Sequence, residues 1–133
     1  MTVQRSTTVR NAVADVVEST IGTAPTLDLY SGTQPANCAT AASGTLLATM
    51  TLPSDWLGAA SSGAKALAGT WQCPSAAATG TLGYYRIVKS GTCHEQGSIS
   101  MSGGGGDMIV DNTSVAITQV INITSFTLTA SGA

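Results

Sequence analysis

The sequence predicts a mainly β chain: a β-sandwich or jelly roll of about seven or eight short strands with one N-terminal helix. Threonine alternates with valine, isoleucine and leucine in short runs, which is typical of half-buried strands. Glycine, proline and serine separate these runs at short intervals. The length of 133 residues fits a single domain over 1–133. Within it we expect an N-terminal arm and helix over 1–22 and a sandwich over 23–133.

One amphipathic helix is predicted near the N-terminus. Apolar residues of the segment Thr7–Ile21 follow the spacing of one helical face. These residues are Val9, Ala12, Val13, Val16, Val17 and Ile21. Residues 6–8 can cap the start of the helix, Gly22 can end it, and Pro25 prevents its continuation. We expect this shallow apolar face to pack on the sheet of its own domain; docking on a partner is the alternative.

Short strands are predicted after the helix from alternating or β-branched segments. The expected ranges are 27–30, 45–52, 65–71, 81–88, 93–101, 108–110 and two strands within 115–129. The alternation slips near Val120, as a bulge or a bend between the last two strands would require. Segments 34–44 and 58–63 have no periodicity and are expected to be surface loops, and the four glycines of 103–106 a flexible hairpin connection.

Charged residues are scarce throughout the chain. The sequence has 5 Lys and Arg, 7 Asp and Glu and one histidine, with a formal net charge of −2. There is no basic field to attract nucleic acid, and no segment is long and apolar enough to cross a membrane. We therefore expect neither nucleic acid nor membrane as a partner. Weak self-repulsion favours association with other protein surfaces.

The sequence offers little material for catalysis. His94 is the single imidazole, the seven acids are scattered, and no serine lies in a strand-to-helix elbow. No lysine and no helix pattern follow the glycines of 103–106, so a phosphate-binding loop is not predicted. We expect no enzyme, no catalytic residue and no cofactor.

Cys38, Cys73 and Cys93 cannot all pair within one chain, and none has a C-x-x-C spacing. Reduced thiols are the simplest interpretation. A zinc site would need His94 and Glu95 beside Cys93, but adjacent side chains on a strand point to opposite faces. We therefore expect no metal site.

The aromatic residues have two possible uses. Tyr30, Trp56, Trp71, Tyr84 and Tyr85 could form a platform on which a sugar stacks. The core of a β-sandwich would require most of these side chains for its packing, and we expect Trp71 and Tyr85 to be buried. Tyr30 and Trp56 lie close to turn residues and are expected to form an exposed pair.

Three segments resemble small virion proteins of tailed bacteriophages. They are LDLYSGTQP at 27–35, ASGTLLA at 42–48 and GTLGYYRI at 80–87. Such proteins share a short helix, a strand ending in Y-x-G-x-x-P, a loop leading into G-T-L-L-A, an aromatic-Arg-Ile strand and a Thr/Ser-rich end. The resemblance covers most of the chain in this order, with departures at the glycines of 103–106 and in the three cysteines.

The resemblance implies a capsid cement or decoration protein that binds the outside of the head and stabilises the shell. Its partners would be the major capsid protein and further copies of itself, in a homodimer or homotrimer. No secretory signal is visible, so we expect synthesis in the cytoplasm of the bacterial host and a final place on the outer capsid surface of the virion.

The expected contact regions are the helix and the loops 34–44 and 58–63. The interaction residues are Val9, Val13, Val16, Val17, Tyr30, Pro35 and Trp56. One alternative function is a tail, baseplate or head–tail junction subunit. The other is a glycan- or receptor-binding β-sandwich module.

Overall fold

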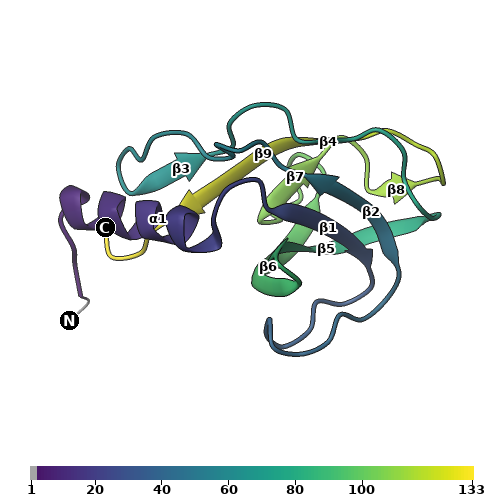
Figure 1. Cartoon of the computed structure of the whole chain (residues 1–133), viewed down its shortest axis with the longest axis horizontal. Helices are drawn as coiled ribbons and strands as arrows, with labels where there is room; N and C mark the ends of the chain where they lie inside the picture. The colour runs from purple at the N-terminus through teal and green to yellow at the C-terminus, as the bar shows by residue number, and fades with distance from the viewer. Residues whose placement is uncertain (1–2) are drawn as a thin grey trace.

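The computed structural model describes residues 3–133 and consists of one helix beside a curled β-sheet (Figure 1). The helix is α1 (Thr7–Ile21). The strands are β1 (Thr26–Ser31), β2 (Leu46–Thr51), β3 (Ala64–Ala66), β4 (Gln72–Cys73), β5 (Gly80–Lys89), β6 (Thr92–Ser100), β7 (Met108–Val110), β8 (Ser114–Val115) and β9 (Ile121–Thr129). The prediction of a mainly β chain with one N-terminal helix is confirmed.

The strands form one mixed sheet in the order β2-β1-β5-β6-β7-β9-β3, which curls into a half-barrel. Two short strands lie off this path, since β4 pairs with β9 and β8 pairs with β5. The predicted sandwich or jelly roll is not confirmed, because the strands are hydrogen-bonded into a single curled sheet. The segment after β6 is also no hairpin: β6 and β7 run parallel, with Ile99 opposite Met108.

The helix has the bounds that its sequence predicts. The hydroxyl of Ser6 accepts a hydrogen bond from the Val9 amide at 3.2 Å and caps the first turn. Gly22 ends the helix with a φ of 102°, and its amide donates to the Glu18 carbonyl at 2.9 Å. In Figure 1, α1 lies at one end of the molecule, close to β3. Within residues 3–133, no helix is long and apolar enough to cross a membrane.

A chain of aromatic rings fills the concave side of the sheet. The ring centroids of Trp56 and Trp71 are 6.0 Å apart, those of Trp71 and Phe126 5.4 Å, and those of Tyr85 and Phe126 5.7 Å. Apolar side chains from β1, β2, β5, β7 and β9 complete the core; the largest of those that are almost fully buried are Leu27, Leu29, Leu47, Ile87, Met108, Val110 and Ile121. The predicted burial of Trp71 and Tyr85 is confirmed.

The slip of the alternation near Val120 corresponds to a bend between β8 and β9. Thr118 has a φ of 72°, and the Gln119 amide donates to the Ala116 carbonyl at 3.0 Å. This turn lets β8 pair with β5 while β9 pairs with β7, β3 and β4.

Gly83 allows β1 and β5 to approach closely at a change of register. Tyr30 pairs with Tyr84, but Ser31 pairs with Leu82, so Gly83 is skipped. A methyl group at position 83 would overlap the carbonyl oxygen of Gly32. Only glycine fits this position without moving the end of β1.

We therefore expect Gly83→Ala to lower the free energy of unfolding by about 1–3 kcal/mol, the usual cost of overpacking. Urea unfolding measures this change. Gly58→Ala is the matched control, because its methyl group would lie 3.6 Å from the Ala66 carbonyl oxygen, an ordinary contact. Equal losses in the two variants would contradict the assigned role of Gly83.

Candidate interaction surface

Most of the predicted apolar face of α1 points away from the sheet. Val9, Val13 and Val16 are 47%, 43% and 59% exposed, and Val17 is half-buried against the core. The helix buries Ile21, the last residue of the predicted face, and Ala14, which lies off that face. The expectation that this face packs on its own domain is therefore wrong for Val9, Val13 and Val16. It holds for Val17 and Ile21. With Ala12, the four valines line one continuous apolar surface, called the valine stripe below.

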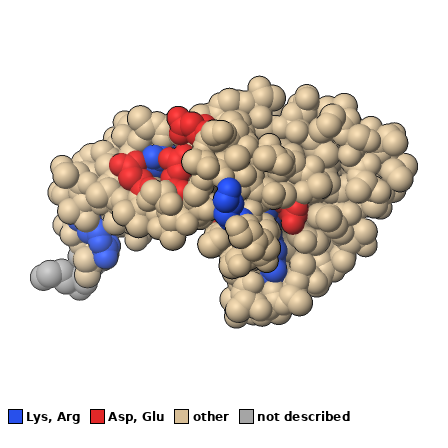
Figure 2. Space-filling view, viewed as in Figure 1, with Lys and Arg blue, Asp and Glu red and all other residues tan. Residues whose placement is uncertain are grey.

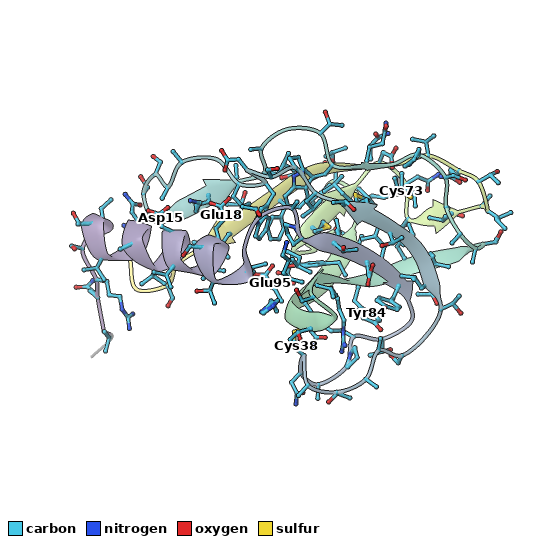
Figure 3. All side chains as sticks on the ribbon, in the orientation of Figure 1. Asp15, Glu18, Cys38, Cys73, Tyr84 and Glu95 are labelled. Atoms are coloured by element: carbon cyan, nitrogen blue, oxygen red, sulfur yellow. A yellow bond between two sulfur atoms is a disulfide. The ribbon has the colours of Figure 1, made fainter. Side chains whose placement is uncertain are left out.

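Beside the buried Ala14 and Ile21, α1 turns polar side chains towards β3, and an ion-pair cluster holds the helix there. Lys65 of β3 is 5% exposed, and its Nζ lies 2.6 Å from Oδ1 of Asp15 and 2.9 Å from Oε1 of Glu18. Figure 3 shows both carboxylates pointing from α1 towards β3. Burial by itself lowers the pKa of Lys65, but the hydrogen bonds and charges of Asp15 and Glu18 outweigh it and raise this pKa. The lysine therefore stays charged.

Backbone groups of the neighbouring loop also bind the helix. The Leu57 amide donates to Glu18 at 3.1 Å. The Gly63 amide donates to Asn11 Oδ1, and Arg10 donates to the Ser62 carbonyl, both at 2.8 Å. The end of the loop 58–63, predicted to contact a partner, is therefore engaged by the protein's own helix.

The other three predicted interaction residues do not join the valine stripe. Trp56 is only 1% exposed, and its indole N–H donates to the Gly22 carbonyl at 3.0 Å, so its predicted exposure is wrong. Tyr30 is half-buried and stacks on Tyr84 with ring centroids 5.1 Å apart, so it forms no exposed pair with Trp56. Pro35 is half-buried in the loop 34–44.

Polar side chains of β5 and β6 fix the loop 34–44. Arg86 is 6% exposed and donates to the Thr40 carbonyl at 2.7 Å. The Tyr84 hydroxyl donates to the Ser43 carbonyl at 2.6 Å and accepts from the Ser43 amide at 2.9 Å. Gln96 donates to the Pro35 carbonyl at 2.7 Å. The loop therefore has a defined conformation, although its sequence has no period.

A disulfide joins the same loop to β6. Cys38 and Cys93 are bonded, with their Cα atoms 5.3 Å apart, so the predicted reduced thiols are wrong for this pair. Cys73 is a buried free cysteine. Nothing in the spacing of the three cysteines identifies which two meet, because 55 residues separate the partners. Both sulfurs are unavailable to the zinc site considered from the sequence.

A small hollow of about 260 Å³ between β6 and β9 holds two carboxylates. Tyr85 donates its hydroxyl hydrogen to Glu95 at 3.0 Å, and Asp107 binds the Ser98 amide and hydroxyl at 3.0 and 3.1 Å. Burial raises the pKa of Glu95; the bond from Tyr85 lowers it, and the charge of Asp107 raises it further. Burial likewise raises the pKa of Tyr85. Within residues 3–133, no three His, Cys, Asp or Glu side chains group to hold a metal ion.

Comparisons with known proteins give no relative for this chain. No family model matches it, and neither the curated proteins nor the solved structures contain a match.

We expect the disulfide to stabilise the fold by up to about 4 kcal/mol, because it closes a long loop in the unfolded chain. The variant Cys38→Ser/Cys93→Ser should lose this amount in urea unfolding and should lose hydrogen-exchange protection over 34–44. A reducing agent should destabilise the wild type towards the level of the variant and leave the variant unchanged. A wild type that is insensitive to reduction would refute the expectation.

A second prediction concerns Glu95. Because the pKa of Glu95 is raised above 4.5 in the fold, the folded protein holds this proton more tightly than the unfolded chain does. Ionisation of Glu95 therefore costs stability as the pH rises above 4.5. Glu95→Gln should raise the free energy of unfolding at pH 7, and this gain should vanish below pH 4.5.

Urea unfolding at both pH values measures the gain, with Asp55→Asn as the control. Asp55 is exposed, and its substitution removes the same charge. A gain from Glu95→Gln that is the same at both pH values would contradict the titration of Glu95 as its cause.

Proposed function

We propose that this chain is a capsid cement or decoration protein of a tailed bacteriophage, which binds the outer surface of the head and stabilises the shell. The observation that carries the proposal is the orientation of α1. Its carboxylates pair with Lys65 of its own domain, while Val9, Val13 and Val16 face outward. An exposed, continuous apolar surface is the usual mark of a protein-binding site. The sequence motifs shared with small phage virion proteins point to the same class.

The valine stripe suits a contact that is repeated many times on a lattice. The ion pairs to Lys65 fix the helix before it binds, so little conformational entropy is lost in the contact. Valine has one preferred side-chain rotamer in a helix and loses little freedom when covered. A contact this small is weak by itself. Several sites on one shell can compensate through avidity, which is the reason to propose a homodimer or homotrimer on the major capsid protein.

The disulfide is compatible with this place in the virion. Disulfides persist on virion surfaces and in other oxidising surroundings, whereas the cytoplasm keeps thiols reduced. A chain made in the bacterial cytoplasm would then close the bond between Cys38 and Cys93 after release. In this proposal the curled half-barrel is an open form of the sandwich or jelly roll expected of such proteins.

The alternative functions use different observations. A tail, baseplate or head–tail junction subunit could use the same valine stripe and would differ in the number of copies per particle. The glycan-binding alternative depended on an exposed Trp56, and that indole is buried. No other observation favours it.

Sedimentation with isolated heads and tails of a related phage that lacks the protein tests the proposal. We expect the protein to bind heads at many copies per particle, saturating a lattice. Binding to tails alone, or at only a few copies, would reject the cement assignment in favour of a junction or tail subunit.

In the same assay we expect Val13→Thr/Val16→Thr to raise the half-saturating concentration about tenfold, since each substitution replaces a methyl group by a hydroxyl. The control is Ile117→Thr/Val120→Thr, which changes two other exposed apolar residues, beside the bend after β8. Equal effects of the two double variants would assign binding to another surface. Deletion of residues 1–22 is a poor test, because it would leave Lys65 buried without its carboxylates.

A further inference from the structure

An acidic hollow borders the valine stripe. It is an open depression of about 600 Å³, lined by Asp15, Glu18, Ser19, Gly22, Thr23, Ser54, Asp55 and Lys65. Figure 2 shows acidic side chains gathered around one basic side chain on this face, over α1 and β3. On the helix, Asp15 and Ser19 come three residues after Ala12 and Val16, so the hollow and the stripe are neighbouring faces of α1.

The hollow carries the whole net charge of the chain. Its three carboxylates and one ammonium give −2, which equals the formal net charge of the protein. Four acids and four bases remain elsewhere and cancel. Lys65 is buried between Asp15 and Glu18, whereas the side chain of Asp15 is 59% exposed and Asp55 is exposed. The charge that a partner meets here is therefore negative.

We propose that α1 docks a partner segment that has an apolar face bordered by lysine or arginine side chains. The apolar face would cover the valine stripe, and the basic side chains would enter the acidic hollow beside Asp55. The inference deepens the proposed function and rests on it only for placing this segment on the capsid. The carboxylates complete the site, because an uncharged apolar partner would leave the net negative charge of the hollow uncompensated.

A second copy of the chain fits this surface less well. If two copies paired their valine stripes antiparallel about a two-fold axis, their acidic hollows would lie on the same side of the helix pair. The negative charges of the two hollows would then repel each other. The chain also has few free cations to offer. Its own carbonyl oxygens accept hydrogen bonds from Arg10, Arg86 and Lys89, and Lys65 is already paired.

The test uses designed helical peptides as probes for the full-length protein. One has a leucine face and a lysine border, a second has glutamate in place of lysine, and a third has the first composition in a non-amphipathic order. Binding is followed by the methyl chemical shifts of Val9, Val13 and Val16. We expect the leucine–lysine helix alone to bind and to shift these methyl groups.

Two variants with the same change of charge distinguish the effect of the hollow on peptide affinity from the effect of the overall charge of the protein. Asp55→Asn should weaken binding of the leucine–lysine helix about two- to fivefold at low salt, and less at high salt. Ser102→Lys adds one positive charge in the exposed glycine-rich loop and should leave the affinity unchanged. Equal effects of the two variants, equal binding of the glutamate peptide, or unshifted valine methyl groups would overturn the inference.

Two further measurements distinguish the remaining outcomes. Sedimentation equilibrium of the protein alone shows whether copies associate; association that Val13→Thr/Val16→Thr abolishes would make a second copy the occupant and overturn the inference. On heads, Asp55→Asn should weaken binding two- to fivefold as it does with the peptide. If the wild type binds the peptide but not heads, the proposed function fails and the inference stands.

Discussion

The buried ion pairs of Lys65 determine which way α1 faces. The side chain of Lys65 is only 6% exposed, so its ammonium group needs compensating charges, and losing a partner of a buried pair costs up to about 3–5 kcal/mol. Covering the exposed halves of Val9, Val13 and Val16 would contribute about 2 kcal/mol in total. The electrostatic requirement therefore wins: the two carboxylates meet Lys65, and Val9, Val13 and Val16 face solvent.

This balance explains what could be predicted of α1 and what could not. The bounds of the helix depend on local features, the apolar period, the Ser6 cap and the Gly22 end, and the sequence shows all of them. Its orientation depends on Lys65, which is fifty residues beyond Asp15 and lies in a three-residue strand. An amphipathic pattern shows which face is apolar and leaves open whether that face meets the core or a partner.

The loop 34–44 and the core aromatics show the same division between local and long-range information. Most strands were predictable because period two and β-branched residues are local signals, whereas the Cys38–Cys93 bond joins distant segments. Trp56 was misplaced because the turn residues before it indicate a surface loop. Its burial depends on the Gly22 carbonyl at the end of α1, which accepts the indole N–H. The closure of the sheet into one half-barrel likewise depends on pairings such as β7 with β9.

The few charges of this chain are used mainly within the fold. Lys65 anchors α1, and Arg86 anchors the loop 34–44 through the Thr40 carbonyl, so two segments without a place in the sheet are held rigidly against it. The ordering of these segments is therefore complete before any partner arrives. In the proposed function, every copy on the shell would bear the ordering cost. Fixing the contact surfaces in advance would therefore gain affinity at each site. In that function, this rigidity and the small number of exposed charges would give the low charge content a role in assembly.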